Sequence, residues 1–223
     1  MRWLALILAL TTAAAADDLT GGVLIAHAVP ECAYTESPPE GWCAACYHEG
    51  VAIDQTTSQN PTLSVTETTH RDFVVLAAWV ESKSFCAIEF GLGAYDPSLL
   101  LIEETAVCNE GSLVDATSGW PGPDEGISIS VARENAWTGA LVPVLYLHGY
   151  VYAASYGSTS VALIEHPETG FRGTASCDSP PQVYAAHDAG TLGINQAGRA
   201  VHPTGDSVPD PPETWGEIKA VYQ

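Results

Sequence analysis

The stretch "ALVPVLYLHGYVYAASY", residues 140–156, decides how the chain is expected to fold. It is rich in aromatic and β-branched residues, which favour a pleated strand. A period of two would place aliphatic side chains such as Leu145 and Leu147 on a core-facing side. Pro143 and Gly149 interrupt the run, so we expect an edge entry or bulge and a bend there. The stretch therefore predicts one long strand.

The opposite side of this strand carries a row of ring-bearing side chains. Its members are Tyr146, His148, Tyr150, Tyr152 and Tyr156. Tyrosines in a row supply flat, amphipathic area of the kind found at sugar-binding sites and protein interfaces. This row is the candidate binding surface. The alternative is that the irregular N-terminal segment covers it and the hydroxyls bond to backbone groups.

Similar short segments recur along the chain with turn signals between them. "RDFVVLAAWV" (71–80) is apolar on both parities and predicts a strand covered on both faces. "SFCAIEFGLG" (84–93) follows the polar link "ESKS", which predicts a hairpin. "GISISVA" (126–132) alternates and places Ile127 and Ile129 on one side. No helical periodicity precedes the C-terminus, so the pattern is typical of an all-β, antiparallel β-sandwich.

The chain divides into four segments. We expect a signal peptide at 1–16, one β-sandwich domain at 17–200 with an irregular N-terminal loop, a Pro-rich linker at 201–213, and a C-terminal tail at 214–223. The tail, "TWGEIKAVYQ", predicts a short helix with Ile218, Val221 and Tyr222 on one side.

The first residues read as an export signal. Arg2 is a minimal basic region, an apolar run follows, and Ala14–Ala16 supplies the small residues that a signal peptidase needs. The mature protein is therefore expected to be secreted or to sit at the cell surface. No later run approaches about 20 apolar residues, so no membrane span is expected.

The charge balance narrows the range of partners. The chain holds 7 Lys+Arg against 27 Asp+Glu, a formal net charge of −20. Such a surface repels phosphate backbones, so we expect no nucleic-acid partner. It is compatible with divalent cations, with cationic partners, or simply with solubility.

The chain has an even number of cysteines. They are Cys32, Cys43, Cys46, Cys86, Cys108 and Cys177. In an exported chain this predicts a disulfide framework. We expect Cys32 to pair with Cys43 or Cys46, Cys86 to pair with Cys108 across neighbouring strands, and Cys177 to take the remaining N-terminal cysteine.

The segment "GWCAACYHEG" (41–50) has the Cys-x-x-Cys spacing of a redox, zinc or haem site. A redox site needs a strand before it and a helix after it, and neither pattern is present. A zinc ribbon needs a second such pair. Haem attachment needs His directly after Cys46, where Tyr47 stands. Structural disulfides are the prediction for Cys43 and Cys46.

No hydrolase or metalloprotease motif is present, so the sequence predicts a non-enzyme without a cofactor. Asp124 and Glu125 lie in a turn-rich loop and form a weak candidate calcium site without EF-hand spacing. Glu103 and Glu104 are adjacent on an expected strand. Neighbours on a strand point to opposite faces, so these two are not expected to share a metal.

Three stretches together resemble a known group. They are "AIEFGLGAYDP" (87–97), "SGWPGP" (118–123) and "TWGEIKAVY" (214–222). They resemble uncharacterised secreted bacterial proteins built on a disulfide-bearing β-sandwich, with a wider analogy to immunoglobulin-like or cohesin-like adhesion modules. The resemblance covers about residues 70–180 and the tail. It implies that the tail acts as an export or surface-attachment signal, and it carries over no functional residue.

These observations predict a secreted, non-enzymatic structural or adhesion protein of the cell envelope that associates with itself or with a cell-surface partner. The alternative is a carbohydrate- or calcium-binding module that uses the tyrosine row or the Asp124–Glu125 loop.

Overall fold

The computed structural model describes residues 18–29, 64–65, 69–152, 157–199, 201, 203 and 213–214. This part of the chain contains fourteen strands, one 3₁₀ turn at Arg133–Asn135, and no α-helix.

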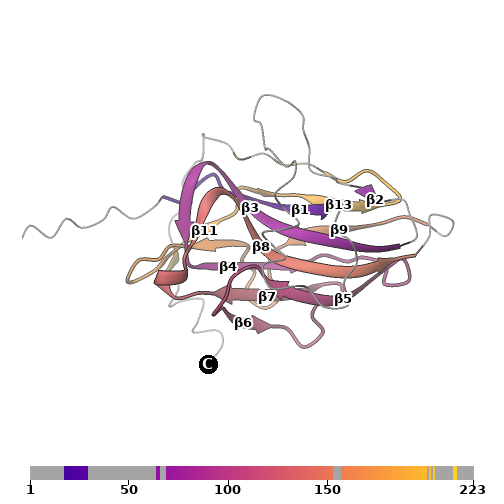
Figure 1. The fold of residues 1–223 in the computed structure, drawn as a ribbon, viewed down its shortest axis with the longest axis horizontal. Coiled ribbons are helices and arrows are strands. Elements are labelled where there is room, and N and C mark those ends of the chain that lie inside the picture. The colour runs from indigo at the N-terminus through magenta and orange to yellow at the C-terminus, as the bar shows by residue number, and fades with distance from the viewer. Residues whose placement is uncertain are drawn as a thin grey trace, which may run out of the picture.

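The strands form two sheets (Figure 1). The five-stranded sheet has the order β12 (Asp188–Ala189), β1 (Val23–Val29), β3 (Thr69–Phe85), β8 (Trp137–Val151) and β5 (Leu100–Val107). The main path of the nine-stranded sheet has the order β14 (Glu213–Thr214), β11 (Gln182–Ala185), β10 (Gly173–Ala175), β4 (Ala87–Leu92), β9 (Thr159–Ile164), β13 (Thr191–Ile194) and β2 (Ser64–Val65). β7 (Glu125–Ser130) pairs with β4, and β6 (Leu113–Ala116) pairs with β7. Among the described strands, two short pairings are parallel, β1 with β12 and β2 with β13, and the others are antiparallel.

One apolar core fills the space between the sheets. Phe73 and Leu147 reach it from the five-stranded sheet, whereas Phe90 and Ile129 reach it from the other sheet. Each such side chain contributes about 1.5–3 kcal/mol when it leaves water. Because both sheets turn one face to this core, the structure confirms the predicted all-β sandwich.

β3 is longer than the sequence indicated, and the predicted hairpin is wrong. Residues 81–84 do not turn; they continue β3 to Phe85, and β4 begins at Ala87 in the other sheet. Figure 1 shows β3 and β8 bending over together at one end of the molecule. Phe85 is fully buried there, with ring centroids 5.1 Å from Trp79 and 5.2 Å from Trp137. Burial of these three rings keeps residues 81–84 in the strand, although these four residues are polar and the first two are exposed.

The disulfide pairing predicted for Cys86 is also wrong. Cys86 bonds to Cys177, with the two Cα atoms 5.0 Å apart. Ala87 pairs with Ala175 between β4 and β10, and the Cys86 amide donates to the Ala175 carbonyl. The two sulfurs therefore meet at one end of that ladder. Cys108 follows β5 in the other sheet and is in a disulfide whose second half lies outside the described residues.

The tail does not begin as a helix. Thr214, its first residue, lies in β14 and pairs with Gln182 of β11. The remainder of the tail lies outside the described residues, as do Cys32, Cys43 and Cys46.

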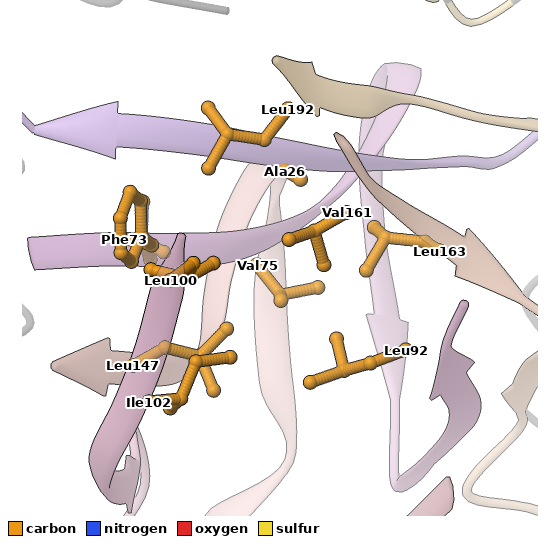
Figure 2. A pocket seen from close by; sticks show the side chains of 11 residues that line it. Ala26, Phe73, Val75, Leu92, Leu100, Ile102, Leu147, Val161, Leu163 and Leu192 are labelled. Carbon is orange, nitrogen blue, oxygen red and sulfur yellow. The ribbon is translucent and has the colours of Figure 1, made fainter. Parts of the chain in front are cut away.

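The core contains a small apolar cavity, shown in Figure 2. Its volume is about 10 Å³, and it lies between strands of both sheets, with Val75, Leu92 and Leu147 among its lining. A water needs about 10–15 Å³ and several polar partners, and this lining has none to offer. The cavity is therefore a small packing gap and not a ligand site.

Tyr95 gives the sandwich a predicted sensitivity to alkali. Its hydroxyl donates to the Pro121 carbonyl at 2.8 Å, and burial raises the pKa of Tyr95 to about 12. Unfolded tyrosine ionises near pH 10. The folded chain therefore holds the phenolic proton where the unfolded chain loses it, so stability falls as pH rises from about 10 to 12, by up to about 2 kcal/mol. Urea unfolding at pH 9, 10 and 11 measures this loss. Tyr95→Phe is expected to make the loss smaller, and an unchanged pH dependence in that variant would contradict the assignment.

Candidate functional site

The candidate site lies on the outer face of the five-stranded sheet, defined here as the face that points away from the core between the sheets. A register shift beside Val144 in β8 precedes the site, and from Leu145 to Val151 the alternation is unbroken. Leu147 and Val151 enter the core. His148 and Tyr150, which alternate with these core residues, therefore lie on the outer face. The bulge thus sits next to Pro143, whereas Gly149 pairs in register with Arg71.

The row of rings is graded from buried to exposed. Tyr146 is 2% exposed and His148 is 4% exposed, whereas Tyr152 is 38% exposed. Tyr150 lies between these extremes. Tyr156 lies outside the described residues. Among the described members of the row, Tyr150 and Tyr152 therefore present ring surface to solvent, and Tyr146 and His148 are part of a buried polar cluster.

The buried half of the row is organised around Asp72 of β3. The Tyr146 hydroxyl donates to Asp72 Oδ1 at 2.5 Å, and Nδ1 of His148 lies 2.7 Å from the same oxygen. Asp72 and His148 are opposite each other in the β3–β8 register. Burial raises the pKa of Tyr146, and the bond to Asp72 raises it further, so its hydroxyl stays a neutral donor. Because Asp72 Oδ1 already acts as the acceptor for Tyr146, we assign the His148 ring proton to Nδ1, which donates to the same oxygen.

A bulge in β5 adds a carboxylate to the cluster. Ile102 pairs with Gly149 and Glu104 pairs with His148, which leaves Glu103 as the extra residue. Its Oε2 lies 3.5 Å from Nε2 of His70 and 4.0 Å from Nε2 of His148. Donor atoms from these three residues all lie within 4.8 Å of one another. Strands β3, β5 and β8 thus bring two imidazoles and one carboxylate together. Among the described residues, these three side chains form a group whose spacing could hold a metal ion.

Gly149 permits the bulge. A Cβ at this position would lie 2.6 Å from the Leu101 carbonyl oxygen and 3.3 Å from the Ile102 Cα. Real Cβ atoms do not approach backbone oxygen so closely, so β5 can lie against β8 here only because residue 149 has no side chain.

Sequence reasoning identified His148 and missed His70, Asp72 and Glu103. β3 offers one signal, because His70 and Asp72 share a parity at its start and lie opposite Tyr150 and His148. The sequence prediction excludes Glu103 because it treats residues 98–108 as a regular strand. The β-bulge at Glu103 makes that expectation wrong, and no residue pattern in "LLLIEETAVC" predicts a bulge.

The candidate calcium residues lie elsewhere. Asp124 is exposed with φ 59°, and Glu125 opens β7 in the other sheet. Neither belongs to the group of possible metal ligands found among the described residues. Calcium binding by Asp124 and Glu125 stays a prediction.

A second hollow, of about 300 Å³, lies beside the Cys86–Cys177 disulfide and is lined partly by Arg133 and Asp178. It brings together no set of groups comparable to the outer-face cluster.

Comparisons with known proteins identify fold neighbours only. No protein-family model matches the chain, and no curated protein matches it. Solved structures similar to it include a cohesin module of a Clostridium perfringens family 33 glycoside hydrolase, at 12% identity and a TM-score of 0.43, covering 60% of this chain and 90% of that one. A type II cohesin domain from the Acetivibrio cellulolyticus cellulosome is 12% identical with a TM-score of 0.42, and the match covers 60% of this chain and 90% of that one. A type I cohesin of Pseudobacteroides cellulosolvens is 12% identical with a TM-score of 0.41, and the match covers 64% of this chain and 92% of that one. Similarity at this level transfers no function to this chain.

Within the described residues, no helix has the length and apolar character needed to cross a bilayer. The Cys86–Cys177 disulfide is of the kind that persists in oxidising compartments.

Proposed function

We propose that this chain is a secreted, non-catalytic adhesion module that associates with a second copy of itself through the exposed end of the outer face. The observation that carries the proposal is the cluster of His70, Tyr150 and Tyr152, with ring centroids 4.7 Å and 4.8 Å apart along the cluster. Aromatic side chains that combine apolar area with a polar tip are enriched at protein interfaces.

The orientation of these rings favours a protein partner over a sugar. The Tyr150 and Tyr152 rings are inclined at 63°, and His70 stands at 79° to Tyr150. A carbohydrate platform offers rings that a flat sugar face can stack upon, and adjacent perpendicular rings do not form one. Tilted rings instead leave ridges and hollows that suit interdigitating side chains. Glycan binding is the second outcome of the test below.

The net charge of the chain predicts how salt changes the strength of self-association. Two copies of a chain with net charge −20 repel each other at low ionic strength. Since salt screens this repulsion beyond about 10 Å at 0.1 M, self-association is expected to strengthen as salt is raised.

Analytical ultracentrifugation of the exported protein at 20 and 200 mM salt tests the proposal. We expect a reversible dimer at high salt, and we expect Tyr152→Ala to weaken it by about 10-fold or more because truncating an interface aromatic costs about 2 kcal/mol. Val80→Ala, which truncates an exposed apolar residue at the β3 corner, serves as the control and should dimerise normally. A strict monomer at high concentration would contradict self-association. Glycan-array binding that is lost in Tyr152→Ala would support the carbohydrate alternative instead.

A further inference from the structure

We propose that His70, Glu103 and His148 bind one divalent transition-metal ion of the Zn²⁺ type. This inference goes beyond adhesion, because the ligands all come from one chain and require no partner. It rests on the convergence of three donors, on the way one of them is held, and on the chemistry of the donor set.

The spacing of the donors is close to what a metal needs. Bonds of about 2.0–2.1 Å in a tetrahedral arrangement separate neighbouring donor atoms by roughly 3.3 Å. The observed separations from Glu103 Oε2 are 3.5 Å to His70 and 4.0 Å to His148. The Glu103 side chain is 41% exposed, so it can adjust by a fraction of an ångström without disturbing the core.

His148 is held as a metal ligand should be held. It is 4% exposed, and its Nδ1 donates to the buried Asp72 carboxylate, which in turn accepts from Tyr146. Metal-binding histidines characteristically donate their other ring N–H to a carboxylate, which sets the tautomer and raises the basicity of the coordinating nitrogen. With the proton on Nδ1, Nε2 is the nitrogen able to coordinate, and it is the one on the Glu103 side.

The other two donors come from the rim of the same cluster. The His70 and His148 rings are parallel within 8°, with centroids 5.3 Å apart. An imidazole coordinates through the lone pair in its ring plane, so one of these parallel rings must turn to share an ion. His70 is the one that can turn more easily, since its side chain is 35% exposed. Because Glu103 is the bulged residue of β5, the backbone of the sheet itself places it at the site.

The donor set selects the class of ion. Two imidazole nitrogens and one carboxylate oxygen suit Zn²⁺ and its first-row neighbours, whereas Ca²⁺ and Mg²⁺ take oxygen ligands. Three protein ligands leave a fourth position for water or for a donor from another molecule. The net charge of −20 further favours the accumulation of cations at the protein surface.

Titration of the chelator-treated exported protein with ZnCl₂, measured by isothermal titration calorimetry, tests the site. We expect one Zn²⁺ per chain. Glu103→Gln should weaken binding by about 100-fold or more, since it removes a ligand, and Asp72→Asn should weaken it by about 10- to 100-fold through His148. Asp115→Asn removes the same charge from exposed β6 in the other sheet and should stay within about 2-fold of wild type.

Further readouts separate a metal site from a merely charged surface. Cu²⁺ bound in place of Zn²⁺ should show hyperfine coupling to two nitrogens by electron paramagnetic resonance, and His70→Ala should reduce it to one. Glu103 is exposed, so Glu103→Gln should fold even if a variant of buried Asp72 does not. Absence of saturable binding, or equal affinities for Glu103→Gln and Asp115→Asn, would overturn the proposal. Tyr152→Ala should retain Zn²⁺ affinity, so failure of adhesion and failure of metal binding are distinguishable.

Discussion

Replacing Cys86 and Cys177 together with alanine is expected to lower the free energy of unfolding by about 2–4 kcal/mol. The disulfide closes a loop with a sequence separation of 91 residues, so its loss restores much conformational freedom to the unfolded chain. For a chain of this size the melting temperature should fall by roughly 5–15 °C. Urea unfolding of the oxidised protein and the double variant measures the change directly.

The controls for this prediction use both redox chemistry and the single variants. Full reduction of the wild-type protein should destabilise it at least as much as the double substitution, because reduction also opens the disulfide of Cys108. Cys86→Ala alone should match the double variant, because either change removes the same bond. Equal stability of wild type and double variant would show that the β4–β10 end of the ladder is held without the covalent link.

Replacing Gly149 with alanine is expected to damage the fold and the metal site together. The new Cβ would lie 2.6 Å from the Leu101 carbonyl oxygen, so β5 must move away from β8. Overpacking of this kind typically costs about 1–3 kcal/mol. Since Glu103 is the bulged residue directly beyond this contact, the same movement withdraws its carboxylate from His148. We therefore expect a lower melting temperature and a Zn²⁺ affinity at least about 10-fold weaker.

Gly139→Ala on the same strand is the matched control. There the nearest atom to a new Cβ is the tip of the Val142 side chain at 3.1 Å, which can shift more easily than backbone. Gly139→Ala should retain Zn²⁺ affinity. If Gly149→Ala kept both stability and affinity, the close approach of β5 would not be what positions Glu103.

The predictable part of this structure depends on regular alternation. Ile127 and Ile129 of β7 are buried as their spacing predicts, and the outer-face parity of Tyr146 and His148 follows from a strand of period two. Alternation is a local property, so the sequence is enough to read it. The all-β class follows for the same reason.

The features that escaped prediction depend on contacts between distant segments. The polar link at 81–84 continues a strand because Phe85 packs between two tryptophans that lie far apart in the chain. Cys86 meets Cys177 because β4 pairs with β10, and pairing between sheet neighbours cannot be read from spacing. Glu103 joins the two histidines through a bulge, which is a response to the neighbouring strand at Gly149. The metal-ligand group is therefore a property of the assembled sheet.

X-ray absorption spectroscopy of the Zn²⁺-loaded protein at the zinc edge tests the metal site most directly. The proposed site predicts only nitrogen and oxygen neighbours at about 2.0–2.1 Å, with the outer-shell scattering of two imidazoles. A sulfur shell at about 2.3 Å would place the ion on cysteines such as Cys43 and Cys46 instead. That result, or a spectrum without imidazole scattering, would contradict the assignment of His70, Glu103 and His148.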